Sequence, residues 1–358
     1  MPSLYRVLVF LGLGVSVLAL VAPAQATSGT LVITSSTTLT EDHFGTIHIV
    51  ADNVTLDGNG FTVHGPTSSG NGLVNVTNVS GVTVKNLMIT GSQVNGLYAE
   101  NGADLRVERN MFIENVNHGV HLHEIVGGAM VANMSRANQG LGFVWTQSRD
   151  VLITNNTALE NGLHGFSLLD GSNGNTVVGN TSLKNGLTGF LVLDSDDTTA
   201  TANTAQLNGR RGFIVANAAQ TALYNNTANR NAAEGFLLSA AENSTLTGNT
   251  SNLNGDPVQL FFAGFALLNG SSGNELRDNS ANRNGDVGFV VEASNENTLT
   301  GNSANANGRI GFEVRSGSSF NIIEQNAAHN NALVDASDDQ SGIGNVWTNN
   351  TFGTSQGI

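Results

Sequence analysis

The sequence of 358 residues contains no cysteine. A chain without thiols has no disulfide framework, thiolate metal site, iron–sulfur cluster or cysteine nucleophile. Basic residues are also scarce, because 14 Lys and Arg stand against 28 Asp and Glu, a formal net charge of −14. Such a field repels phosphate backbones, so nucleic acid is not an expected partner.

Charge is almost absent from residues 1–26, where Arg6 is the only ionised side chain. An apolar run beginning at Val7 follows it, and the segment ends in Ala24-Gln25-Ala26. This pattern predicts a secretory signal peptide that is cleaved after Ala26. No later apolar run is long enough for a membrane span, so we expect an exported protein, periplasmic or extracellular, with a formal charge of −15 once Arg6 is removed.

What the sequence has in abundance is a repeat of about 23 residues. Gly-Phe pairs occur with their phenylalanines at Phe143, Phe166, Phe190, Phe213, Phe236, Phe265, Phe289 and Phe312. An asparagine series keeps the same register at Asn110, Asn133, Asn156, Asn180, Asn203, Asn226, Asn249, Asn279, Asn302, Asn326 and Asn350. A second series follows five residues later, from Asn115 to Asn331.

A unit this short cannot bury its own apolar face, so it must stack on copies of itself. Units rich in Thr, Asn, Ser and Gly favour strands and turns over the helices of a leucine-rich repeat. The sequence therefore predicts an all-β fold, a right-handed parallel β-helix of about 23-residue coils. We expect Gly and Asn to supply corners with positive φ, and each ladder Asn to donate its amide to the equivalent Asn of the next coil.

The register also predicts boundaries within a single domain. After the signal peptide we expect irregular N-terminal coils and a cap over 27–95, then regular coils over 96–331, with an insertion near 256–262. A closing coil over 332–358 is expected to contain Trp347 and Phe352.

The stretch from Thr46 to Val63, followed by the Gly-Phe and Asn ladders, resembles the right-handed parallel β-helix family. Within the pectin-lyase-like superfamily the sequence is most similar to NosD-like proteins. That resemblance implies the fold, but it leaves function open. The superfamily holds polysaccharide lyases, glycoside hydrolases, uronate epimerases, a copper-related periplasmic protein and non-catalytic surface proteins.

Strand alternation identifies a candidate catalytic face. If Phe points inward in each coil, Tyr98 stacks beside His121 and Glu100 beside His123, with His118, Glu114 and Glu124 nearby. His and Tyr can serve as base and acid in elimination from a uronate polymer. The segment from His118 to Glu124 resembles the catalytic strand of alginate epimerases and lyases, although it lacks their Asp-Pro before His-Glu. A solvated polar strand is the alternative.

Metal binding and a carboxylate pair are further interpretations. His121, His123 and Glu100 could hold Cu or Zn. An acidic group that could hold Ca²⁺ comprises Asp170, Asp194, Asp196 and Asp197. Glu292 and Glu313 have the spacing of an inverting glycosidase pair, but Arg315 should stack on Glu292, which indicates a surface ion pair instead.

Between its polar ends the outward face should be apolar. The predicted apolar stripe comprises Leu169, Leu191, Leu193, Ile214, Leu237, Leu268 and Val290. An exposed patch of this kind usually marks an interface. We expect either the insertion at 256–262, a protein partner or self-association to cover it.

Three functional hypotheses follow from the sequence. The first is an exported carbohydrate-associated protein, acting as a uronate lyase or epimerase through Tyr98, His121, His123 and Glu100. The second is a non-catalytic surface or binding rod, and the third is a NosD-like periplasmic copper-associated protein.

Overall fold

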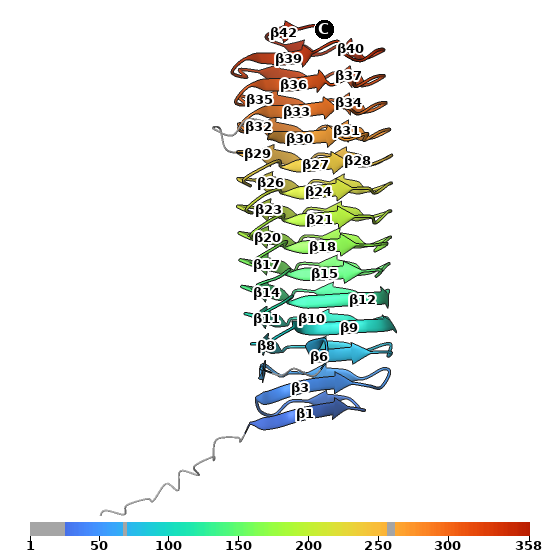
Figure 1. The fold of residues 1–358 in the computed structure, drawn as a ribbon, viewed down its shortest axis with the longest axis vertical. Coiled ribbons are helices and arrows are strands. Elements are labelled where there is room, and N and C mark those ends of the chain that lie inside the picture. The colour runs from blue at the N-terminus through green and yellow to red at the C-terminus, as the bar shows by residue number, and fades with distance from the viewer. Residues whose placement is uncertain (1–25, 67–69, 256–261) are drawn as a thin grey trace, which may run out of the picture.

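The computed structural model describes residues 26–66, 70–255 and 262–358, which form a rod of stacked coils (Figure 1). Of the predicted signal peptide, only Ala26 is among the described residues. Of the predicted insertion at 256–262, only Phe262 is. In the described part of the chain, no helix is long and apolar enough to cross a membrane.

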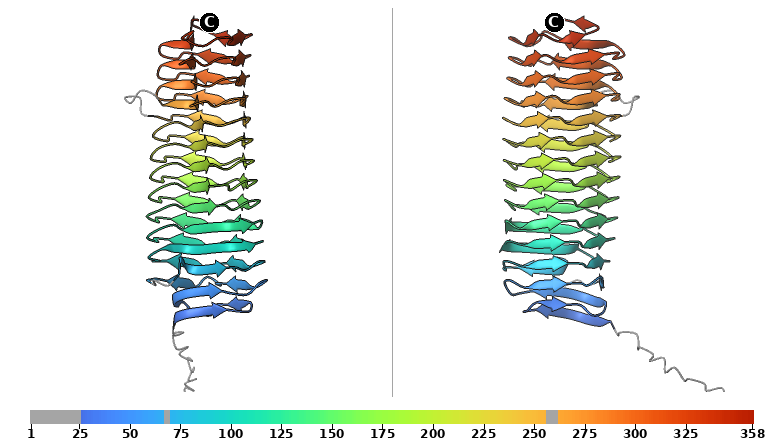
Figure 2. Two further views of the ribbon diagram at one scale, coloured as in Figure 1. Left: turned by 45° about the vertical axis from the view of Figure 1, so that its right-hand side comes forward. Right: turned by 180° about the vertical axis from the view of Figure 1, so that it is seen from behind.

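A typical coil contains three short strands, and each strand pairs in parallel with its equivalents in the coils before and after. Three ladders of strands therefore run along the rod (Figure 2). The first ladder consists of β2 (Thr37–Thr38), β4 (Thr55–Asp57), β7 (Thr83–Lys85), β10 (Arg106–Glu108), β13 (Ala129–Val131), β16 (Leu152–Thr154), β19 (Thr176–Val178), β22 (Thr199–Thr201), β25 (Ala222–Tyr224), β28 (Thr245–Thr247), β31 (Glu275–Arg277), β34 (Thr298–Thr300), β37 (Ile322–Glu324) and β40 (Val346–Thr348).

The second ladder begins one corner later in each coil. It consists of β5 (Thr62–His64), β8 (Met88–Thr90), β11 (Met111–Ile113), β14 (Met134–Arg136), β17 (Thr157–Leu159), β20 (Thr181–Leu183), β23 (Thr204–Gln206), β26 (Thr227–Asn229), β29 (Thr250–Asn252), β32 (Ser280–Asn282), β35 (Ser303–Asn305), β38 (Ala327–His329) and β41 (Thr351–Phe352).

The third ladder contains the Gly-Phe repeats. It consists of β6 (Gly72–Thr77), β9 (Asn95–Ala103), β12 (Val120–Val126), β15 (Phe143–Thr146), β18 (Phe166–Leu169), β21 (Phe190–Leu193), β24 (Phe213–Ala216), β27 (Phe236–Ser239), β30 (Ala263–Leu268), β33 (Val287–Glu292), β36 (Ile310–Arg315), β39 (Val334–Asp338) and β42 (Ser355–Gln356). At the N-terminal end, β1 (Thr27–Ile33) pairs with β3 (His43–Ile49), and β3 pairs with both β5 and β6. The predicted parallel β-helix is thus confirmed.

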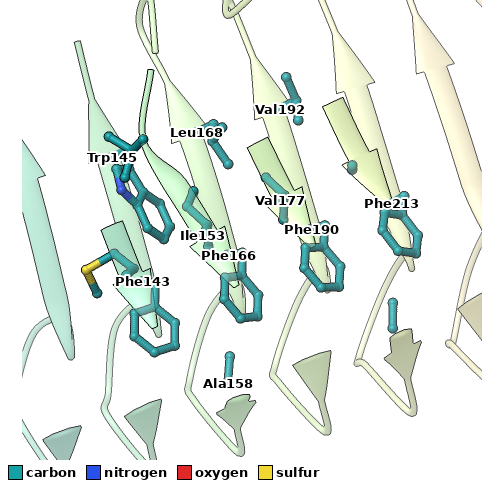
Figure 3. Close-up of a cluster of buried hydrophobic side chains, with 14 of the residues drawn as sticks. Phe143, Trp145, Ile153, Ala158, Phe166, Leu168, Val177, Phe190, Val192 and Phe213 are labelled. Atoms are coloured by element: carbon teal, nitrogen blue, oxygen red, sulfur yellow. The ribbon is translucent and has the colours of Figure 1, made fainter. Parts of the chain in front are cut away.

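The core is a column of stacked phenylalanine rings (Figure 3). Phe166 and Phe190 lie with ring centroids 4.8 Å apart and nearly parallel, and the next rings, up to Phe312, continue at 4.7 to 4.8 Å. All are buried. This spacing is that of paired strands, so each ring stacks on the ring of the next coil.

Two asparagine ladders satisfy the buried corners, as the sequence predicts. Asn180 donates from Nδ2 to Oδ1 of Asn203 at 3.0 Å and to the Ile153 carbonyl at 2.8 Å. Its backbone N–H also donates to Asn203 Oδ1, at 2.8 Å. These side chains are almost completely buried. The amides therefore replace the backbone hydrogen bonds that the turns cannot make.

The expectation that Gly and Asn supply positive-φ corners is confirmed in part. Gly179 (φ 65°) and Asn225 (φ 53°) hold such corners, but the ladder asparagines themselves and the Gly-Phe glycines do not. The residue before each ladder Asn takes that conformation, as Ala202 (φ 56°) and Leu207 (φ 55°) do before Asn203 and Asn208. Gly165 has no positive φ. A Cβ there would lie 2.2 Å from Ser182 Oγ, so this glycine is required by close packing.

The predicted exposed stripe is also wrong in part. Leu237 and Val290 are 7% and 4% exposed, and the other stripe residues are half-buried. Leu237 and Val290 belong to a small cluster outside the main core that includes Ala263, Val287 and Ile310, and Ile214 and Leu268 pack against this cluster. Ala263, Val287 and Ile310 stand just before the Gly of their coils, so the chain itself covers this C-terminal part of the stripe.

Candidate functional site

The candidate site lies on the outer face of the third ladder, where β9 and β12 pair. Their register sets Tyr98 opposite His121 and Glu100 opposite His123, the arrangement expected from the sequence. The Tyr98 and His121 rings meet edge to face with centroids 5.3 Å apart. His118, which precedes β12, lies edge to face with His121 at 5.8 Å. Three rings from two neighbouring coils therefore form one cluster.

Thr146, on the next strand β15, connects the two histidines of β12. Its Oγ1 lies 2.9 Å from His121 Nε2 and 3.0 Å from His123 Nδ1. One hydroxyl has a single proton to donate, so it can donate to only one of these ring nitrogens and must accept an N–H from at least one of them. This shared contact fixes the orientation of both rings. Sequence reasoning did not assign Thr146 to the site.

The histidines nearest Tyr98 are held neutral. Burial, aided by the neighbouring His118 and His123, lowers the pKa of His121 to about 4. Burial also lowers the pKa of His118 to about 4. The Nδ1 atom of His118 accepts the Leu141 N–H at 3.0 Å, so the His118 ring proton is on Nε2. At neutral pH both rings are free bases.

The pKa of the Tyr98 phenol is shifted upward, whereas the pKa values of the two histidines are shifted downward. Burial raises the pKa of Tyr98 above its usual value, and the Glu100 carboxylate raises it further. Tyr98 is only 8% exposed, and it keeps its proton at neutral pH. The face therefore sets a proton donor beside a neutral proton acceptor.

The other residues expected near the site lie at its edge. His123 Nε2 lies 3.7 Å from Glu124, and Glu114 sits at the exposed corner after β11.

The residues do not fit a metal centre. Across the residues that the structure describes, no group of three or more His, Asp or Glu side chains is placed to hold a metal ion. At the predicted Cu or Zn site, His121 and His123 both turn a ring nitrogen to Thr146, and Glu100 lies beside Tyr98. The donors needed for a copper site are therefore not assembled.

The acidic group predicted to hold Ca²⁺ serves the turns instead. Asp170, Asp194 and Asp197 all have positive φ between 49° and 56°. Asp196 accepts the Ala219 N–H of the next coil at 2.7 Å. These contacts assign the aspartates to corners of the solenoid.

The carboxylate pair near the C-terminal end forms an ion-pair network. Arg315 pairs with Glu292 at 2.8 Å and with Glu313 at 3.0 Å. Arg309 also contacts Glu313 at 3.0 Å, and it pairs with Asp286 at 2.7 Å. Glu313 is 9% exposed. The predicted stacking of Arg315 on Glu292 is confirmed, and both carboxylates are engaged by arginines.

With the geometry described, the chain can be compared with known proteins. Residues 158–262 and 187–356 match the family described as periplasmic copper-binding protein (NosD), and residues 24–182 match the family described as right handed beta helix region. The NosD matches together span 158–356, more than half of the chain. The chain belongs to the right-handed parallel β-helix repeat family. No curated protein matches this β-helix chain significantly.

Two solved β-helix structures show the same architecture. The A-module of the mannuronan C-5 epimerase AlgE4 from Azotobacter vinelandii is 15% identical, with a TM-score of 0.52 over 86% of this chain and 88% of that one. Tailspike protein 3 of bacteriophage CBA120 is 13% identical, with a TM-score of 0.52 over 88% of this chain and 58% of that one. At these identities the likeness shows the β-helix fold.

Proposed function

We propose that this protein is exported and acts on an acidic polysaccharide at the Tyr98–His121 face, as a uronate lyase or epimerase. The observation that carries the proposal is the contact between a protonated phenol and a neutral imidazole, 5.3 Å between ring centroids, on one outer face. A similar fold in a mannuronan epimerase and a phage tailspike supports a carbohydrate substrate.

The chemistry uses the proton next to the uronate carboxylate. His121 removes the C5 proton, and the electron pair of that bond is delocalised into the carboxylate. The Nε2–H of His118 is available to donate to the carboxylate as its charge grows. In a lyase the bond from C4 to the glycosidic oxygen then breaks, and Tyr98 gives its proton to the departing oxygen. In an epimerase Tyr98 returns a proton to C5 from the opposite face.

His123 and Glu100 have positioning roles in this proposal. His123 shares the Thr146 hydroxyl with His121, which fixes the orientation of the base. Glu100 lies opposite His123 and, with burial, keeps Tyr98 protonated.

The experiment incubates the mature protein with alginate and pectate in D₂O. Ultraviolet absorbance detects unsaturated ends, and proton NMR detects deuterium at C5. The His121→Ala and Tyr98→Phe variants should lose about 100-fold or more of either signal. His329→Ala, an exposed histidine on the second ladder, is the matched control. No signal from the unmodified protein on any uronate polymer would overturn the catalytic proposal, and tight binding without turnover would then favour the binding rod.

A copper-associated role is the second candidate, because the matching family is described as periplasmic copper-binding. The described side chains do not form a three-ligand group, which is why the polysaccharide proposal is preferred. One equivalent of copper retained after dialysis by the unmodified protein, and lost in His121→Ala and His123→Ala, would reverse that preference.

A further inference from the structure

The lysines and arginines that the structure describes divide into two groups. Among the residues that the structure describes, ten basic side chains form ion pairs. Three others, Arg210, Arg230 and Arg283, make no ion pair with any described residue, although acidic residues outnumber basic ones two to one. All three are exposed. In a chain this acidic, a cation without a carboxylate partner is unexpected.

Arg230 and Arg283 directly follow β26 and β32, and Arg210 lies in the turn after β23. Figure 1 shows these strands stacked along one side of the rod. Arg210 and Arg230 line a hollow of about 510 Å³, and Arg283 lines a neighbouring one of about 400 Å³. Leu253 lines both hollows, so the two lie side by side and together form one grooved surface. We call this the arginine groove. No described residue that lines it is Asp or Glu.

The fold does not require arginine at these positions. Arg230 and Arg283 stand just before ladder asparagines, with φ of 54°. The equivalent corners of other coils hold Ala137 and Ala306 in the same backbone conformation. Neighbouring Arg211, in contrast, is half-buried and pairs with Glu234 at 2.6 Å. The groove arginines therefore carry charge that the solenoid does not use.

Their spacing indicates the shape of the ligand. Arg230 and Arg283 are two coils apart, about 10 Å at about 4.8 Å per coil. Between them lies the apolar side chain of Leu253. An extended chain with intermittent anionic groups and apolar faces matches this alternation, and guanidinium groups hold carboxylates in a two-point geometry. DNA, with one charge per about 1.7 Å, would be repelled by the acidic protein as a whole.

We propose that the arginine groove binds the carboxylates of an acidic polysaccharide chain. This inference rests on the proposed function for its polymer class, but it concerns a separate site. The His121 strand (β12) and β24, the strand that follows Arg210, are four coils apart, about 19 Å along the rod. A polymer aligned with the rod can therefore contact the groove while another of its residues lies at Tyr98 and His121.

The test measures binding of polymannuronate and polygalacturonate by affinity electrophoresis and calorimetry. The groove variant is R210Q/R230Q/R283Q. The control variant, R136Q/R149Q/R277Q, removes the same charge from arginines that are 51%, 60% and 53% exposed and paired with exposed carboxylates. We expect the groove variant to bind about tenfold more weakly or worse, with a smaller salt dependence, and the control to bind as the parent does.

The outcomes separate this inference from the proposed function. Equal affinity of the two triple variants, or no binding of acidic polysaccharide by the parent, overturns the inference. So does equally tight, groove-dependent binding of single-stranded nucleic acid. If His121→Ala abolishes turnover while the groove variant binds normally, only the inference fails. If binding needs the groove arginines but no polymer is turned over, only the catalytic proposal fails. Melting temperatures of both variants confirm that they are folded.

Discussion

His121 and His123 share one hydroxyl group, because Thr146 Oγ1 lies 2.9 Å from Nε2 of the first and 3.0 Å from Nδ1 of the second. The hydroxyl has a single proton and cannot donate to both nitrogens, so at least one of them is protonated and donates to Oγ1. The tautomers of the two histidines are therefore coupled through a residue of the next coil. A change of ligand at one ring alters the hydrogen bonding of the other.

Replacing Thr146 with Val should uncouple the two rings while preserving the shape of β15. We expect the ¹⁵N resonances of His121 and His123 to shift toward a mixture of tautomers, and any uronate turnover to fall by about tenfold or more. Thr146→Ser keeps the hydroxyl and should retain the parent spectrum. Unchanged ¹⁵N resonances in the Val variant would contradict the coupling.

Stability should decline as the pH falls from about 6.5 toward 4. The pKa of His118 and that of His121 are each about 4 in the folded protein, below the usual value of 6.5. In this window the unfolded chain binds protons that the folded one excludes, so the free energy of unfolding rises with pH and is fully restored above about 6.5.

The measurement is the melting temperature at pH 7 and at pH 4.5. The double variant His118→Asn/His121→Asn should lose less melting temperature between these pH values than the parent does. An equal loss in both proteins would show that these two rings do not carry the pH dependence.

A buried ladder asparagine should contribute far more to the free energy of unfolding than an outward asparagine of the same coil does. Asn226 donates to the Ala200 carbonyl at 2.9 Å, and its Oδ1 accepts from the Asn203 backbone at 2.9 Å. Asn226→Ala leaves both buried groups unsatisfied, and should cost about 2 to 5 kcal/mol of unfolding free energy.

The control is Asn229, which is half-buried on the outer side of β26 and accepts one N–H from Asn252 at 3.2 Å. Asn229→Ala should cost about 1 kcal/mol or less. Denaturant unfolding of the two variants checks the difference, and similar losses would mean that the ladder is not a special source of stability.

Much of the fold can be predicted from the sequence because every coil repeats the same strands, turns and inward-facing positions. The inward position of Phe213 and the pairing of His121 with Tyr98 follow from alternation and period alone. Alternation does not specify what lies over the outward side chains. Leu237 is outward yet 7% exposed, because Ala263, in the segment leading into the next Gly-Phe strand, folds over that face.

The candidate site was predictable only to the level of neighbouring residues. Strand register brought Tyr98 to His121, but the low pKa of His121 depends on its burial and on the neighbouring His118 and His123. The arginine groove was missed because charge counts do not tell which cations are paired. Arg211 and Arg210 are adjacent in sequence, yet only Arg211 has a carboxylate partner among the described residues.

Glu313 should be a structural residue with no part in catalysis. It is 9% exposed and lies 3.0 Å from both Arg309 and Arg315. Glu313→Gln removes the charge that holds the two guanidinium groups together, and we expect it to cost about 1 to 3 kcal/mol. Glu275→Gln, at an exposed pair with Arg277, should change stability by less than about 1 kcal/mol. Denaturant unfolding measures both. If Glu313→Gln instead abolished turnover of a polysaccharide while leaving stability unchanged, Glu292 and Glu313 would regain their interpretation as a hydrolytic pair.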